Sequence, residues 1–125
     1  MAGRKKIIAK NQKELDEIPK DFDGIVVIEV KRLHHPVQLL VPDPKFKEIR
    51  VCGRANVEVH KRQHAECFDS SMCFAYEHAE VVLHDRSRGE FYDQSKGILR
   101  DSSKGYVGDE GASIRKVHQR KKKKS

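Results

Sequence analysis

An eight-residue periodicity in the second half of the sequence constrains the fold more than any other feature. Residues 48 to 111 divide into eight octads without insertion or deletion: EIRVCGRA, NVEVHKRQ, HAECFDSS, MCFAYEHA, EVVLHDRS, RGEFYDQS, KGILRDSS and KGYVGDEG. Positions two and four are apolar or small in every octad, position eight is small in all but one, and position six is acidic in the last six. Self-similarity at a fixed short period is typical of stacked-repeat architectures.

The octad has a direct structural interpretation. Positions eight, two and four lie two residues apart, so in an extended strand they share one face, which we expect to point inward. Positions six and seven are mostly polar, and an Asp at position six can cap its own backbone in an Asx-type turn, so a tight corner should follow each strand. One such strand cannot bury its face alone, but stacked copies can. With two octads per coil, the sequence predicts a mainly β fold, a short right-handed parallel β-solenoid built from eight-residue repeats.

The octads also resemble a known repeat. Phage and prophage proteins, mostly of Gram-positive bacteria, carry arrays that read roughly Asn-Ser-Ser-Val-Glu-Ala-Tyr-Asp. The segments DQSKGILRD, AEVVLHD, ANVEVH and MCFAYE, at residues 93–101, 79–85, 55–60 and 72–77, are similar to these units. This copy departs from the family pattern in being short and in having glycine at position two of its last three octads. The resemblance implies a solenoid and a mobile-element context, and it implies no catalytic residues.

The flanking segments do not follow the octad pattern. Ahead of it we expect strands at 5–9, 24–30 and 37–41, and a helix that begins at the N-cap Asn11, runs through Ile18 and is stopped by Pro19. A solenoid needs its first edge covered, because an open row of N–H and C=O groups invites aggregation. The sequence therefore predicts a small α+β N-terminal cap over 1–47, the octad solenoid over 48–119 and a disordered basic tail over 120–125.

The net charge of +7 is localised in the sequence. The last eleven residues contain seven bases and no acid: Arg115, Lys116, Arg120, Lys121, Lys122, Lys123 and Lys124. Because the chain has 26 bases and 19 acids in all, the remaining 19 bases balance the acids, and the body is neutral. We expect the tail to bind polyanions through its charge. A role as an address or solubilising end, or recognition by an acidic protein surface, are the alternatives.

Two columns at sixteen-residue spacing predict surfaces on the solenoid. At position five, His60, Tyr76 and Tyr92 should form an aromatic ladder, with Phe68 and His84 on the alternate corner. Such ladders stiffen a rod by self-stacking, and the alternative is that they bind a base or a peptide. At position three, which should face solvent, Val82, Ile98 and Ile114 predict an exposed apolar stripe, the candidate interface for the N-terminal segment or another chain.

Metal and enzyme hypotheses find little support in the residues. His60, His64, Cys67 and Cys73 suggest zinc, but the C-x5-C spacing is longer than structural sites prefer, and both cysteines fall on inward positions. The acidic column suggests calcium, yet turn capping accounts for it without an ion. His34 and His35 form one local cluster suited to acid–base chemistry, and surface histidines are the simpler interpretation. We expect no metal, no cofactor and no enzymatic activity.

These observations lead to a functional expectation. Three cysteines without an apolar leader indicate a reducing compartment, so we expect a cytoplasmic protein, in the host cell if phage-encoded. No apolar run approaches the ~20 residues that span a bilayer, so no membrane partner is expected. The leading hypothesis is a non-enzymatic phage or mobile-element protein that binds a host or phage protein or nucleoprotein, with inhibition of a host nucleoprotein defence system as one consequence. The alternatives are a self-assembling structural protein that polymerises, or forms a homodimer, through the ends of the solenoid, and a nucleic-acid-binding protein that acts through its tail.

Overall fold

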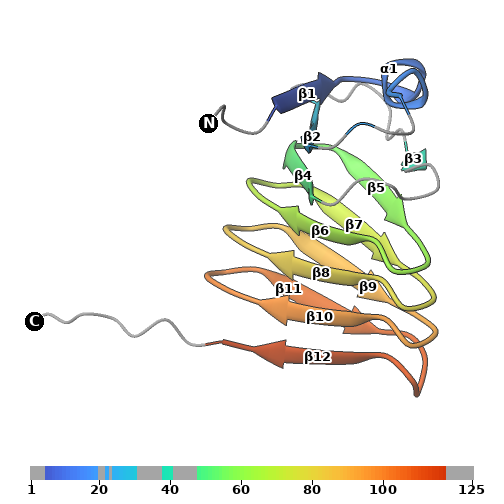
Figure 1. Ribbon diagram of the computed structural model, residues 1–125. Helices are drawn as coiled ribbons and strands as arrows, with labels where there is room; N and C mark the ends of the chain where they lie inside the picture. Colours follow the sequence, from blue (N-terminus) through green and yellow to red (C-terminus); the bar gives the residue numbers. More distant parts are fainter. Residues whose placement is uncertain (1–4, 20–21, 23, 31–37, 41–47, 118–125) are drawn as a thin grey trace, which may run out of the picture.

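The chain folds into a parallel β-solenoid, in which strands from successive coils stack into two facing sheets (Figure 1). The computed structural model describes residues 5–19, 22, 24–30, 38–40 and 48–117. Sheet A contains, in spatial order, β1 (Lys5–Ala9), β2 (Gly24–Val30), β4 (Glu48–Gly53), β6 (His64–Cys67), β8 (Glu80–Leu83), β10 (Lys96–Leu99) and β12 (Ser113–Lys116). Sheet B contains β3 (Gln38–Leu40), β5 (Asn56–Val59), β7 (Met72–Ala75), β9 (Arg88–Phe91) and β11 (Lys104–Val107). The predicted mainly β, solenoid fold class is confirmed.

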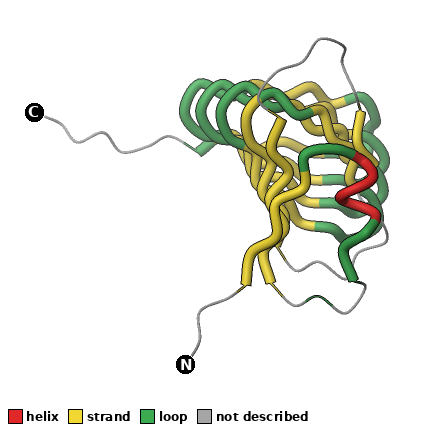
Figure 2. Tube along the Cα trace, turned by 90° about the horizontal axis from the view of Figure 1, so that it is seen from above, coloured by secondary structure: helices red, strands yellow, loops and turns green. Residues whose placement is uncertain are grey.

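Two octads make one coil. Val57 in β5 pairs with Cys73 in β7, and Ala65 in β6 pairs with Val81 in β8, so each residue lies beside the one sixteen positions further along the chain. Seen from above, the coils lie almost behind one another (Figure 2). Because the coil length is constant across the octads, each octad position forms a straight column along the stack. Inward, outward and corner columns then have separate structural roles.

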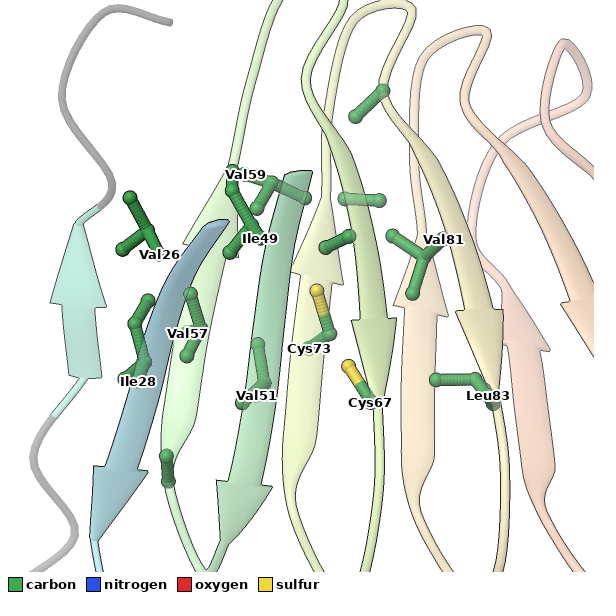
Figure 3. Packing of buried hydrophobic residues seen from close by; sticks show 14 of the residues in the cluster. Val26, Ile28, Ile49, Val51, Val57, Val59, Cys67, Cys73, Val81 and Leu83 are labelled. Atoms are coloured by element: carbon green, nitrogen blue, oxygen red, sulfur yellow. The ribbon is translucent and has the colours of Figure 1, made fainter. Parts of the chain in front are cut away.

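The inward columns form a narrow core of positions two, four and eight (Figure 3). A bulky residue at position four is matched by a small residue at position two of the next octad. A Cβ added to Gly97 would lie 2.3 Å from Cζ of Phe91, and one added to Gly89 would lie 3.0 Å from Cδ1 of Leu83. Glycine at position two in the last octads therefore leaves the space that the larger side chains of Leu83, Phe91 and Leu99 fill.

Each corner is a tight turn with an unusual residue at position six. In octads two to seven the N–H of position eight donates to the C=O of position five, for example from Ser87 to His84 at 3.0 Å. Position six has positive φ in octads one to seven, as the first central residue of a type II′ turn requires. These residues are Gly53, Lys61, Asp69, Glu77, Asp85, Asp93 and Asp101, with φ between 54° and 71°.

The N-terminal segment continues sheet A. Strands β1 and β2 form as predicted and pair in parallel, and β2 pairs with β4. The predicted helix is present as α1 (Gln12–Asp16), with Oδ1 of Asn11 accepting from the N–H of Glu14 at 2.8 Å, but it ends at the C-cap Glu17 and does not run through Ile18 as expected. Leu15 and Ile18 are buried in the core cluster. The predicted strand 37–41 corresponds to β3, and residues 37 and 41 lie outside the described residues.

The last coil contains one extra residue, which corrects the predicted register. Ser113 pairs with Lys96 and Ile114 with Gly97, so this coil is seventeen residues long. In the corner after β11, the N–H of Ala112 donates to the C=O of Asp109 at 3.2 Å, and Ala112 takes the buried eighth position in place of Gly111. Ile114 therefore occupies inward position two, whereas the sequence interpretation put it at outward position three. Residues 118–125, which include the whole of the tail predicted over 120–125, lie outside the described residues.

None of the helical structure in the described ranges is long and apolar enough to cross a bilayer.

Candidate interaction surfaces

The acidic column at position six holds neighbouring coils together. The carboxylate of each member accepts a hydrogen bond from the backbone N–H of the position-six residue in the preceding coil, as when Oδ2 of Asp85 accepts from the N–H of Asp69 at 3.0 Å. The same bond joins Gly53 to Asp69, Lys61 to Glu77, Glu77 to Asp93, Asp85 to Asp101 and Asp93 to Asp109, at 2.6–3.0 Å. The expected Asx-type capping of each Asp's own backbone is replaced by this bond between coils.

The carboxylates of position six also line a groove on the surface. This groove, of about 710 Å³, follows one corner of the stack and is lined by Glu77, Asp93 and Asp109 together with His78, Gln94 and Gly111. All three acids already accept a backbone N–H, which gives them a structural role. Among the described residues, no group of three or more His, Cys, Asp or Glu side chains is arranged to hold a metal ion.

The predicted aromatic ladder stacks along the same corner. The ring centroids of His60 and Tyr76 are 5.0 Å apart, and those of Tyr76 and Tyr92 are 5.3 Å apart, with interplanar angles of 12° and 14°. On the alternate corner Phe68 stacks on His84 at 4.6 Å. The sixteen-residue spacing therefore places the rings as predicted.

Acids on sheet B are in contact with this ladder. The hydroxyl of Tyr92 donates to the carboxylate of Glu90, and Oε1 of Glu58 lies 3.4 Å from Nε2 of His60. The hydrogen bond to Glu90, followed by desolvation, raises the pKa of Tyr92 to about 12. Desolvation, followed by the charge of Glu58, raises the pKa of Tyr76. Both effects move the pKa of these two phenols further above physiological pH.

Sheet B presents an outward row that the sequence interpretation missed. Glu58, Phe74, Glu90 and Tyr106 pair in register at position three, and Tyr106 is 61% exposed. Phe74 and Tyr106 are spaced by two coils, so they do not form a sixteen-residue repeat of apolar residues. Listing every aromatic residue at position three, rather than searching for one repeated column, would have found both.

The predicted apolar stripe on sheet A is shorter than expected. Val82 and Ile98 are paired neighbours at position three, as predicted, but the next residue in this column is Arg115. The inclusion of Ile114 is wrong, because the extra residue in the last coil turns its side chain toward the core, where it packs partly buried. Val82 and Ile98 line a groove of about 310 Å³ with His64, Glu80, Lys96, Ser113 and Arg115.

The remaining predicted site residues fall into two groups. Arg115 and Lys116 lie on β12 with exposed side chains. Arg120, Lys121, Lys122, Lys123 and Lys124, and the histidine pair at 34–35, lie outside the described residues.

The residues of the zinc hypothesis are separated between core and surface. Cys67 and Cys73 are fully buried in the core as free thiols and lie opposite one another in the same coil (Figure 3). The hydrogen bond with Cys67, followed by burial, raises the pKa of Cys73 well above its ordinary value. The imidazole of His60 stacks in the ladder, and Nδ1 of His64 lies 3.6 Å from Oε1 of Glu80 on the outer face of sheet A. The four side chains therefore do not converge on one site.

In comparisons with known proteins, the chain matches no family model, no curated protein and no solved structure.

Proposed function

We propose that this chain is a non-enzymatic interaction protein that binds a protein partner through the outer face of sheet B and the adjoining aromatic ladder. The observation that supports this is the regular presentation of Phe74, Tyr76, Tyr92 and Tyr106 on neighbouring coils. Aromatic side chains are enriched at binding hot spots. A ring that is already stacked loses little conformational freedom when a partner covers it, which lowers the cost of binding.

The charges on this face indicate the chemistry of the partner. Glu58 and Glu90 alternate with the aromatic residues of the outward row at position three, and Glu77 lies at the adjoining corner, while the bases Arg88 and Lys104 of this face stand in the separate row at position one. These carboxylates repel a phosphate backbone and attract cations. An arginine side chain of a partner can stack on an aromatic ring and pair with a neighbouring carboxylate. A protein surface with exposed arginine is therefore the partner that fits.

The biological setting is part of the same proposal. The octads resemble phage and prophage repeats, which supports a mobile-element protein acting in the host cytoplasm. Binding to a component of a host nucleoprotein defence system, and inhibition of that system, is the consequence that we propose for such a protein. The basic C-terminal segment would then add polyanion contact near a nucleoprotein target.

A capture experiment tests the proposal. The full chain, a Phe74→Ser/Tyr106→Ser variant and a form without residues 116–125 are each used to capture proteins from a nuclease-treated lysate of the organism that encodes the chain. We expect a protein bound by the full chain to be lost with the sheet B variant and kept with the truncated form.

The control variant is Val82→Ser/Ile98→Ser, which makes the same kind of change on the opposite face. Capture that depends only on residues 116–125, or that survives loss of Phe74 and Tyr106, would contradict binding through sheet B. Circular dichroism of every variant checks that the solenoid is intact.

A further inference from the structure

We propose that the outer face of sheet A is the surface through which two copies of this chain associate about a two-fold axis. This face lies on the opposite side of the solenoid from the surface assigned to a partner above (Figure 1). The inference goes beyond that function and does not depend on it. It rests on the order of charges along two outward rows of β6, β8, β10 and β12.

The two rows change sign at the middle of the face. Row one, at octad position one, contains His64, Glu80, Lys96 and Ser113, paired in this order. Row three, at position three, contains Glu66, Val82, Ile98 and Arg115. Both acids lie on β6 and β8, both bases lie on β10 and β12, and the apolar pair lies at the centre. The face is therefore acidic on one half and basic on the other.

A two-fold rotation makes this face complementary to itself. The axis lies in the plane of the contact, parallel to the strands and midway between β8 and β10, so β8 covers β10 of the second copy and β6 covers β12. It places Glu80 opposite Lys96, Glu66 opposite Arg115 and Val82 against Ile98, each contact occurring twice. His64 meets Ser113, so no like charges are opposed. A contact in which the same patch serves both subunits is the usual interface of symmetric dimers.

The same operation applied to sheet B does not give a complementary contact. There the outward rows contain Asn56, Met72, Arg88 and Lys104, and Glu58, Phe74, Glu90 and Tyr106. A two-fold axis between β7 and β9 places Phe74 against Glu90 and Met72 against Arg88. This contact would bury Glu90 and Arg88 against apolar side chains that cannot pair with their charges, which is unfavourable. Self-complementarity thus distinguishes sheet A from sheet B.

The described part of the N-terminal segment does not cover the apolar pair Val82 and Ile98. The described N-terminal elements β1, β2 and α1 lie at the far end of the stack from β8 and β10 (Figure 1). Each acid does have a neighbour within its own chain: Glu66 lies 3.4 Å from Nε2 of His84, and Glu80 lies 3.6 Å from Nδ1 of His64. These contacts hold the acids on their half of the face. Lys96 is the in-register neighbour of Glu80 across β8 and β10, and Arg115 lies beside Ile98 on the basic half, where the second copy adds a carboxylate opposite each base.

The size of the face predicts a weak dimer. Four residues per strand at ~3.3 Å and strands ~4.8 Å apart give a patch of roughly 13 Å by 15–20 Å, smaller than a permanent interface needs. We therefore expect the dimer to form only at the highest protein concentrations of a dilution series. Because the outer contacts are exposed ion pairs, added salt should weaken it.

A charge-exchange experiment tests the two-fold contact. The mass of the intact chain is measured by analytical ultracentrifugation over a concentration series, for the wild type, Glu80→Lys and Lys96→Glu. We expect the wild type to approach the dimer mass and each single variant to stay monomeric, because each places two like charges opposite one another. An equimolar mixture of the two variants should form a heterodimer, since every contact at this pair then joins opposite charges. The double variant should regain self-association.

Arg88→Glu, which reverses a position-one base on sheet B, is the matched control and should leave the wild-type association unchanged. A wild type that stays monomeric throughout the series overturns the proposal, including the case in which this face binds a different protein. A dimer that persists in both single variants, or a mixture of folded variants that fails to associate, shows that another surface is used and overturns it equally. Circular dichroism confirms that each variant is folded.

Discussion

At the scale of single residues, position six shows how one side chain can solve two problems of a corner. The turn requires positive φ, which costs L-residues other than Gly, Asn and Asp roughly 1–2 kcal/mol. The carboxylate of an acid at position six also accepts a hydrogen bond from a backbone N–H of the preceding coil, as Asp85 does from Asp69. The recurrence of acids at this position is therefore explained by local conformation and by hydrogen bonding between coils together.

Replacing Asp85 tests these two contributions together. Asp85→Ala removes the acceptor for the N–H of Asp69 and places alanine at positive φ, so we expect a loss of about 1–3 kcal/mol in the free energy of unfolding. Asp85→Asn keeps an acceptor oxygen and tolerates positive φ, so it should stay close to the wild type. Urea unfolding measures both. Arg86→Ala, exposed at position seven, is the control, and an equal effect of alanine at both positions would exclude the ladder as a source of stability.

The buried thiols give a second prediction at this scale. Cys67 and Cys73 are fully buried, and the pKa of Cys73 is raised by its hydrogen bond with Cys67 and by burial. Desolvation, followed by the charge of Asp69, raises the pKa of Cys52 as well, but its side chain is partly exposed. Because alkylation needs an accessible thiolate, iodoacetamide should modify Cys52 first in the folded protein. Mass spectrometry should show modification of all three only after denaturation, and equal native rates would be inconsistent with this core.

At the scale of elements, strands face each other through complementary volumes. Phe91 at the end of β9 fills the space above Gly97 in β10, and Leu83 in β8 fills the space beside Gly89 in β9. Both pairs join position four of one octad to position two of the next, six residues further along the chain. The octad specifies that these positions face inward, and the packing decides which member of each facing pair is large.

Gly97→Ala tests this packing. At an unstrained position this change usually stabilises a protein by about 0.4–1 kcal/mol. Here the new Cβ would lie 2.3 Å from Cζ of Phe91, so we expect a loss of about 1–3 kcal/mol instead. In a Phe91→Leu background the penalty should shrink, which a double-mutant cycle measures as coupling. Independent, additive effects would argue against the facing pair.

The aromatic ladder predicts a pH dependence. The pKa of Tyr92 is raised from 10.0 to about 12, chiefly by its hydrogen bond to Glu90, so the folded state favours the neutral phenol. The stability from this contact should be fully present below pH 10 and lost as the pH rises through about 12. Glu90→Gln should return the titration of Tyr92 toward its ordinary value. Ultraviolet absorbance of the phenolate follows this titration, and Tyr92→Phe identifies its contribution. An unchanged titration in Glu90→Gln would contradict the assigned cause.

At the scale of the whole molecule, stability is distributed over nearest-neighbour contacts between coils. In the octad region each coil pairs with the coil before and after it and with no other. Such a stack behaves approximately as a sum of coil and interface terms. Coil length is then the quantity that must be conserved, and individual coils can be exchanged.

A deletion series tests this modularity. Removal of residues 72–87 takes out one whole coil, leaves every later strand in phase and should give a folded solenoid of lower thermal stability. Removal of residues 72–83 breaks the octad period, since the inward residues that follow are moved out of phase, and should prevent cooperative unfolding. Circular dichroism and calorimetry distinguish the two. Equal behaviour of both deletions would mean that the period does not organise the fold.

The sequence determined most of the fold because the octad is a local rule repeated in register. Inward positions, corners, the helix after Asn11 and the stacking of His60, Tyr76 and Tyr92 follow from spacing alone. The resemblance to phage repeats adds context and does not replace this physical argument.

Only the tertiary structure decided how the coils meet. It showed that each position-six carboxylate accepts a hydrogen bond from the backbone of the preceding coil, and that Phe91 packs into the space left by Gly97. It also showed that an extra residue in the last coil places Arg115 on the outer face instead of Ile114. These facts depend on which residues sixteen or seventeen positions apart become adjacent, and a one-residue shift reverses the face on which a strand side chain lies. That shift replaced Ile114 with Arg115 at the end of the expected apolar stripe and placed a second base on the half of the face that already carries Lys96.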